Sequence, residues 1–167
     1  VPTIPQAIAQ RAAHPAYGYF QPRKAYYDAV IHWHEQSYGT TGLTPECIGY
    51  ENGVLGGVVS ALKIFCQPGD SIIIQSPTYI GFTHCAEDNG WKLVLNPLIQ
   101  DETGIWRIDY KDLEEKVSSG KIHAAIFCSP HNPAGRVWEP WEIEKLMDIY
   151  RKYDVYVVSD EIWADLT

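Results

Sequence analysis

Apolar segments of strand length alternate with segments of helical periodicity along most of the chain. Uninterrupted apolar and β-branched runs at 71–75 (SIIIQ), 122–128 (IHAAIFC) and 155–159 (VYVVS) are typical of strands buried on both faces. A further strand is predicted at 92–96. Helical spacing predicts helices over 22–38, 53–66, 78–89, 109–119 and 140–153. Strands that alternate with helices indicate βαβ units, so we predict a three-layer α/β/α fold around a mostly parallel sheet.

The ends of some elements carry recognisable signals. Residues 1–21 mix Pro, His and Tyr, which predicts a short helix followed by an irregular loop. The next helix is expected to end at Gly39, and Asp109 is a candidate N-cap for a later one. We expect residues 1–40 to form an N-terminal segment with an interface loop and helix, and residues 41–167 to form the α/β domain.

Composition and charge exclude several classes of protein. The 167 residues are 46% apolar and 20% charged, which is an ordinary globular composition. With 13 Lys and Arg against 21 Asp and Glu, the formal charge is −8 and no basic block stands out. Nucleic acid is therefore not an expected partner. No apolar run reaches the roughly 18 residues of a membrane span, and no signal peptide or lipidation motif is recognisable, so a membrane is not an expected partner.

The cysteines show no metal-binding or disulfide pattern. None of the 4 forms a C-x-x-C pair or zinc-finger spacing. Cys66, Cys85 and Cys128 lie in apolar stretches, so we expect small buried hydrophobes in a reducing compartment and a cytoplasmic location. The chain begins at Val1 and contains one methionine, Met147, from which we expect it to be part of a longer protein.

Candidate chemistry is sought where the predicted strands end, because ligands of parallel sheets bind outside the carboxyl ends of the strands. Residues 51–57 (ENGVLGG) precede an apolar helix, whose free N–H groups could bind an anion such as phosphate. A glycine packing point is the alternative. Tyr79 follows the strand at 71–75 and could stack on a planar ligand, or it could simply cap the core.

Two further segments follow the later strands. In residues 129–136 (SPHNPAGR), two prolines and a glycine form a rigid loop that aims Asn132, although a tight turn alone could explain them. Asp160 follows the strand at 155–159 and could hold a cation or a protonated ring nitrogen. A solvated carboxylate is the alternative. No Walker A pattern occurs, so a nucleoside triphosphatase is not expected.

Taken in order, these segments resemble the large domain of fold-type I pyridoxal 5′-phosphate (PLP) enzymes, the aspartate aminotransferase superfamily with its class I/II aminotransferases. The resemblance rests on SPTY (76–79), HNPAGRVW (131–138) and VVSDEIWADL (157–166). Together with HPAYGY (14–19), these segments are most similar to the cystathionine β-lyase or carbon–sulfur lyase branch. The resemblance implies PLP as cofactor, a small-molecule amino-acid substrate and a homodimer of the parent protein.

The resemblance also implies a role for each matching residue. Asp160 would favour the protonated ring nitrogen by raising its pKa, and Glu161, the next residue along the strand, should point the other way. Asn132 would hydrogen-bond the 3′-oxygen of the ring, and Tyr79 would stack on its face. Tyr19 would reach across the dimer to the phosphate of the partner's cofactor.

The phosphate loop and one position beside the ring depart from the family pattern. Gly53, Val54 and Leu55 match the residues that cradle the phosphate through backbone N–H groups. Many relatives place Ser or Thr where Val54 and Leu55 stand, so a hydroxyl contact is lost. Trp163 stands where Tyr or His often hydrogen-bonds the 3′-oxygen, and its indole can donate but not accept.

Two family residues have no counterpart in the chain. No lysine lies in the Ser-x-x-Lys context of the residue that forms the Schiff base, and the arginine that binds the substrate carboxylate is missing. Arg136 follows the Asn132 loop and is expected to be structural. We therefore expect an incomplete large domain, without the lysine-bearing segment and the C-terminal small domain, that is inactive by itself.

Three functions are compatible with these residues. The first is a carbon–sulfur β-lyase that converts cystathionine or a cysteine conjugate to a thiol, pyruvate and ammonia. The second is a class I/II aminotransferase with the same cofactor site, and the third is a non-catalytic aminotransferase-like module. The residues present here do not separate the first two.

Overall fold

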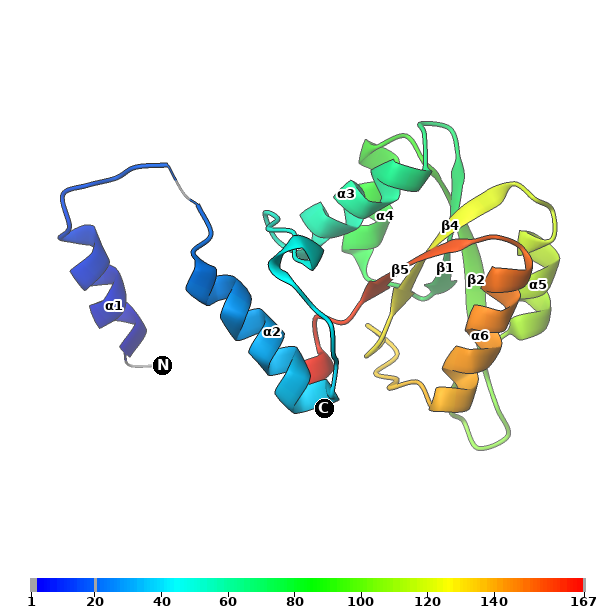
Figure 1. Cartoon of the computed structure of the whole chain (residues 1–167). Helices are drawn as coiled ribbons and strands as arrows, with labels where there is room; N and C mark the ends of the chain where they lie inside the picture. The colour runs from blue at the N-terminus through cyan, green and yellow to red at the C-terminus, as the bar shows by residue number, and fades with distance from the viewer. Residues whose placement is uncertain (1–2, 20, 167) are drawn as a thin grey trace. The chain divides into compact units, whose positions relative to one another are not determined.

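The computed structural model describes residues 3–19 and 21–166 of the chain. The chain divides into two compact units, Val1–Tyr50 and Glu51–Thr167, which are described separately below (Figure 1). The predicted division into an N-terminal interface segment (1–40) and a cofactor-binding α/β domain (41–167) stays a prediction.

The described residues of the first unit form three helices. They are α1 (Thr3–Ala12), α2 (Lys24–Tyr38) and the short 3₁₀ helix η1 (Pro45–Cys47). The short first helix and the end of α2 at Gly39 were both predicted and are confirmed. Gly39 has φ 63°, a left-handed conformation that glycine adopts without a Cβ clash, and its N–H donates to the Glu35 carbonyl at 3.1 Å. None of the described residues in these helices is buried, so they add no side chain to a core.

The second unit is the predicted α/β domain. In chain order its elements are α3 (Val54–Phe65), β1 (Ser71–Ser76), α4 (Ile80–Asp88), β2 (Lys92–Gln100), β3 (Trp106–Ile108), α5 (Tyr110–Val117), β4 (Ile122–Cys128), α6 (Pro140–Lys152), β5 (Tyr156–Asp160) and η2 (Ala164–Leu166). The strands form one sheet in the order β3-β2-β1-β4-β5. All neighbours are parallel except β2 and β3, which confirms the mostly parallel sheet.

Two helix starts follow the predicted signals. The Asp109 carboxylate accepts the N–H groups of Lys111 at 3.1 Å and Asp112 at 3.0 Å, which satisfies two of the free donors at the start of α5. Pro140 occupies the first position of α6, where its missing N–H removes no helical hydrogen bond. These local signals explain why the ends of both helices were predicted closely.

The sheet differs from the prediction at its β3 edge. The strand β3 was not predicted, because three residues are too few to show an alternating pattern. It pairs with the second half of β2, where Leu98 lies opposite Ile108. The end of β2 was predicted at Asn96, but the strand continues to Gln100. Pro97 is the last residue that pairs with β1, so the proline marks a change of partner strand rather than the end of the strand.

Side chains on the two faces of the sheet form two separate cores. On β1, Ile72 and Ile74 belong to one core with the helices α3 and α4. Ile73 belongs to the other core, with α5 and α6 (Figure 1). The alternation follows from the two-residue period of a strand. Helices cover both faces, which confirms the three-layer α/β/α fold.

The predicted burial of three cysteines is also confirmed. Cys66, Cys85 and Cys128 are buried and free, and burial raises the pKa of each thiol. Buried thiols with a raised pKa remain protonated and pack as small hydrophobes.

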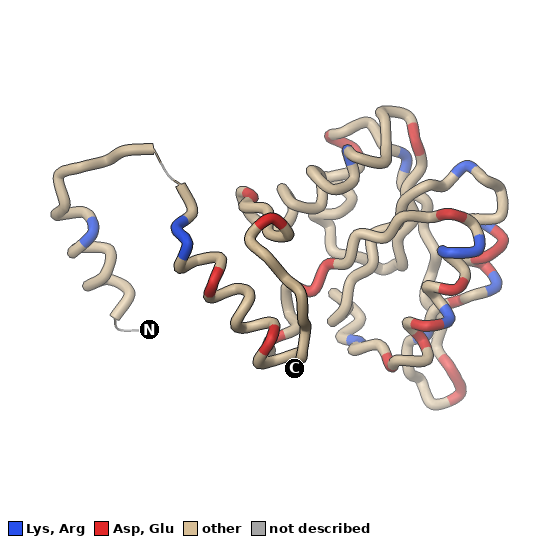
Figure 2. Tube along the Cα trace, viewed as in Figure 1, with Lys and Arg blue, Asp and Glu red and all other residues tan. Residues whose placement is uncertain are grey.

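Charged residues of both signs are frequent in α5 and α6 (Figure 2). Lys116 pairs with Asp112 at 2.6 Å within α5, and Lys152 of α6 pairs with Glu114 of α5 at 2.6 Å. This face therefore combines both signs of charge. Within residues 3–19 and 21–166, no helix has the length and apolar character needed to cross a membrane.

Candidate functional site

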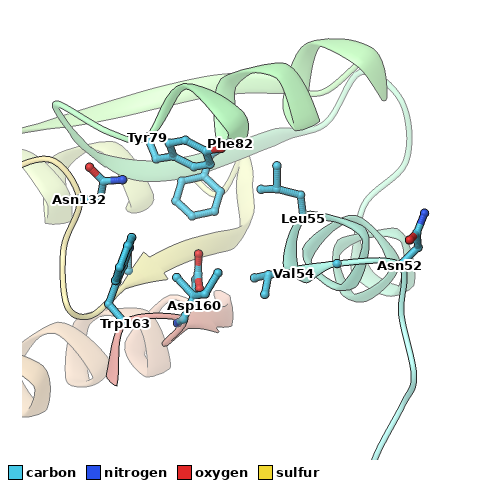
Figure 3. A pocket seen from close by; sticks show the side chains of 11 residues that line it. Asn52, Val54, Leu55, Tyr79, Phe82, Asn132, Asp160 and Trp163 are labelled. Carbon is cyan, nitrogen blue, oxygen red and sulfur yellow. The ribbon is translucent and has the colours of Figure 1, made fainter. Parts of the chain in front are cut away.

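A cavity of about 430 Å³ lies at the carboxyl edge of the sheet (Figure 3). It is lined by Asn52, Gly53, Val54, Leu55, Tyr79, Phe82, Cys128, Asn132, Asp160, Ile162 and Trp163. All the predicted site residues except Tyr19 are among them. They come together because β1, β4 and β5 are parallel, so the segments that follow them meet at one edge.

Asp160 supplies the carboxylate of the cavity. It is the last residue of β5, lies opposite Cys128 of β4 and is only 6% exposed. One carboxylate oxygen accepts the Ile162 N–H at 3.1 Å, and none of the described Lys, Arg or His side chains forms an ion pair with it. A buried carboxylate without a cation favours a positively charged ligand. Glu161 is exposed and accepts the Ser159 hydroxyl, so its side chain is not part of the cavity.

The start of α3 supplies backbone donors. Gly53 has φ 82° and ψ 165°, a conformation essentially restricted to glycine, and no side chain caps the helix. The first helical hydrogen bond runs from the Gly57 N–H to the Gly53 carbonyl at 3.2 Å. The N–H groups of Val54, Leu55 and Gly56 therefore have no acceptor within the helix. Together with the helix dipole, they form a site for an anion, and only backbone groups contribute because both lining side chains are apolar.

An aromatic pair covers one side of the cavity (Figure 3). Tyr79 contacts Phe82 edge to face, with 5.7 Å between ring centroids, and Phe82 is fully buried. Tyr79 itself is 41% exposed, so its ring is supported by the core without being enclosed by it. A Cβ at Gly81 would run into the Tyr79 ring and lie 2.8 Å from Leu55 Cδ1. Glycine at this position therefore lets the tyrosine ring take its place beside the start of α3.

Asn132 and Trp163 lie on the side of the cavity opposite Val54 and Leu55 (Figure 3). Asn132 is carried by the loop between β4 and α6. Neither side chain forms a hydrogen bond with another described residue, so both keep their donors for a ligand. The indole of Trp163 can only donate, whereas the Asn132 amide can donate or accept.

The groups of this cavity suit a planar aromatic ligand with a positively charged ring nitrogen and an anionic substituent. The aromatic face of Tyr79 matches the planar ring, the carboxylate of Asp160 matches the charged nitrogen, and the free N–H groups of α3 match the anionic substituent. PLP has all three, so the residues present fit this cofactor. Lysine is absent from the described residues that line the cavity.

Tyr19 belongs to the first unit, where its side chain is fully exposed. Its role toward a partner subunit stays a prediction. Arg136, which was expected to be structural, pairs with the buried Glu142 and lies over the Trp138 ring, 5.1 Å from its centroid.

Other lining residues were not selected from the sequence. Phe82 stands three residues after Tyr79 in the predicted helix, and this spacing could have paired the two rings. Cys128 ends β4, and its thiol donates to the Pro130 carbonyl at 3.2 Å. Its place at the end of an apolar run was a usable signal. Ile162 lies in the turn after β5, where the sequence pattern gives no comparable signal.

The fold and the arrangement of the site are those of the fold-type I family of PLP-dependent enzymes. A family model described as aminotransferase class I and II matches residues 1–167, and the chain belongs to this family. The resemblance inferred from the sequence motifs is therefore confirmed.

Several carbon–sulfur lyases are similar to the chain. It is 37% identical over 163 residues to cystathionine beta-lyase PatB of Bacillus subtilis, which covers 98% of this chain and 42% of that protein. The PLP-bound C-S lyase of Staphylococcus hominis superimposes with a TM-score of 0.85 at 31% identity, covering 96% of this chain and 42% of the lyase. Cystalysin of Treponema denticola, whose crystal structure contains PLP, gives a TM-score of 0.85 at 31% identity, covering 97% and 41%. The chain thus spans about two fifths of the length of these relatives.

Proposed function

We propose that the chain forms the cofactor-binding part of a PLP-dependent carbon–sulfur β-lyase, which acts on cystathionine or a cysteine conjugate. The observation that carries this proposal is the buried, cation-free carboxylate of Asp160 in a cavity that also contains the free N–H groups of α3. The similarity to named carbon–sulfur lyases supports the choice of reaction.

When bound, PLP supplies an electron sink for the negative charge that develops at the substrate α-carbon. Asp160 would hold a proton on the ring nitrogen, which keeps the ring electron-poor. Tyr79 would fix the plane of the ring from one face. Asn132 and the Trp163 indole N–H would bind oxygen at the 3′ position, and the N–H groups of Val54 and Leu55 would bind the phosphate.

The lysine that attaches the cofactor and the arginine that binds the substrate carboxylate would lie outside residues 1–167. The absence of lysine among the described lining residues supports this part of the proposal. By itself the chain would bind the cofactor without turning over substrate. In the whole protein, Tyr19 would contact the cofactor phosphate of a partner subunit in a cytoplasmic homodimer.

Two alternatives have specific support. An aminotransferase would use the same cavity residues, and the matching family model carries that name. A non-catalytic module would also explain a cavity that no described lysine lines.

The first prediction concerns cofactor binding by the 167-residue chain. Pyridoxamine 5′-phosphate is the appropriate probe, because it lacks the aldehyde with which PLP would modify surface lysines. We expect saturable binding of one molecule per chain, measured by equilibrium dialysis with absorbance detection. Binding that does not saturate, or that pyridoxamine without phosphate matches in affinity, would contradict the proposed site.

The second prediction separates a lyase from an aminotransferase. The longest reading frame that encodes these residues is expressed, loaded with PLP and given cystathionine. A β-lyase should release pyruvate and ammonia without any added keto acid. Turnover that depends on a keto acid, without release of ammonia, would replace the lyase by the aminotransferase. No turnover in either assay would favour the non-catalytic module.

A further inference from the structure

An ionic cluster around a fully buried carboxylate, that of Glu142, is not used by the proposed function. Glu142, in the first turn of α6, is 0% exposed. One of its carboxylate oxygens accepts from Arg107 at 3.1 Å. The other accepts from Arg136 and from the Glu139 N–H at 2.9 Å. Desolvation of such a group is unfavourable unless its partners are held in good geometry, so the arrangement must be closely defined.

Arg107 and Arg136 come from different parts of the fold. Arg107 lies on the edge strand β3 and also pairs with Asp101 at 2.9 Å. Arg136 lies in the loop that carries Asn132 and stacks on Trp138. The side chains of Arg107 and Arg136 are 22% and 16% exposed, so both are largely removed from water. Of the two arginines that pair with Glu142, only Arg136 therefore belongs to the loop that carries Asn132.

Backbone hydrogen bonds connect Arg136 to His131, the residue before Asn132. The His131 N–H donates to the Arg136 carbonyl at 2.7 Å, and the Gly135 N–H donates to the His131 carbonyl at 2.8 Å. These two bonds close the loop at its base, with Asn132 in the segment between them. The position of Arg136 therefore determines the position of the segment from which Asn132 faces the cavity (Figure 3).

Other contacts fix the base of the loop to the sheet. The Trp138 indole N–H donates to the Cys128 carbonyl at 3.0 Å, at the end of β4. His131 is 3% exposed, and its ring packs edge to face on Trp138. With these contacts on the strand side, Arg136 is the ionic contact that joins the loop to α6.

We propose that Arg136, held by Glu142, is a positioning residue that sets Asn132 for its contact with the ring of the bound cofactor. The inference rests on the proposed PLP site, since it assigns a task to Asn132 there. Arg136 acts through the loop and touches no ligand. Arg107 binds the other oxygen of the same carboxylate, but it lies on β3 and not in the loop of Asn132. It therefore provides a matched control.

The experiment compares Arg136→Met with Arg107→Met, each with and without Asn132→Ala. Each Met variant removes one guanidinium from Glu142 and keeps an unbranched side chain. The readout is the affinity of the 167-residue chain for pyridoxamine 5′-phosphate. Asn132→Ala alone is expected to weaken binding about tenfold through the lost hydrogen bond. Arg136→Met should weaken it about fivefold, and Arg107→Met by less than about twofold.

The double variants test the coupling. If Arg136 acts through Asn132, Arg136→Met should add less than about a twofold loss once Asn132 is Ala. Full additivity of the two losses, or equal losses from Arg136→Met and Arg107→Met, would overturn the inference. Arg136→Lys, which keeps the charge without the planar fork, should restore part of the affinity and serves if Arg136→Met does not fold. If Asn132→Ala leaves the affinity unchanged, the proposed site itself is wrong at this position.

Discussion

Asp160→Asn should weaken the binding of pyridoxamine 5′-phosphate by about ten- to one-hundredfold. The substitution keeps the shape of the side chain and removes its charge. A hydrogen bond to a charged group contributes about 1.5–3 kcal/mol, and about 1.4 kcal/mol corresponds to a factor of ten in affinity. Because Asp160 is the only acidic residue among the described residues that line the cavity, no neighbour can replace it as the counter-ion of the ring nitrogen.

Glu161→Gln provides the control for this prediction. It removes the neighbouring carboxylate, which is exposed and bonded to Ser159, and it should leave the affinity unchanged within about twofold. Equal losses in the two variants would indicate a general effect of charge and contradict a specific contact with Asp160.

The pH dependence of binding gives a second readout of the same contact. A carboxylate at the ring nitrogen favours the protonated ligand, so affinity for the ligand should fall as pH rises through the ligand's pKa. In Asp160→Asn this slope should flatten, because the variant no longer distinguishes the two protonation states by charge. An unchanged slope in the variant would mean that the ring nitrogen lies elsewhere.

The site could be predicted from the sequence to the extent that its residues directly follow strands. Tyr79, Asn132 and Asp160 come shortly after three apolar runs, and parallel pairing brings the ends of those runs to one edge. The glycine at the start of α3 was recognisable for a similar reason, since a helix start is a local feature. Most of the site could therefore be predicted from the order of strands and helix starts along the sequence.

The ionic cluster could not be predicted because it depends on pairing between distant segments. Glu142 stands in the first turn of a helix, where an acidic residue is common and usually solvated. Its burial requires Arg107, which lies on β3, the strand that was too short to be recognised. It also requires Arg136, whose orientation follows from the loop between β4 and α6. No periodicity in the sequence reports these contacts.

The same cluster leads to the largest expected effect on stability. Glu142→Ala should lower the free energy of unfolding by about 3–5 kcal/mol, since it leaves the largely buried Arg136 without its carboxylate partner and Arg107 with only the partly exposed Asp101 and Glu139. For a domain with a typical stability of about 5–15 kcal/mol, this is a large fraction of the total. Urea unfolding followed by far-ultraviolet circular dichroism would measure the change.

Glu144→Ala is the matched control on the same helix. Glu144 is exposed, so its replacement should change the free energy of unfolding by less than about 0.5 kcal/mol. Combined replacement of the cluster (Arg107→Met, Arg136→Met and Glu142→Leu) should recover much of the loss, because a buried ionic cluster can be exchanged for apolar side chains at little cost in stability. If Glu142→Ala proved no more destabilising than Glu144→Ala, the carboxylate would not be the structural centre of the cluster. A combined variant less stable than Glu142→Ala would show that the loss of stability does not come from the two arginines that Glu142→Ala deprives of this carboxylate.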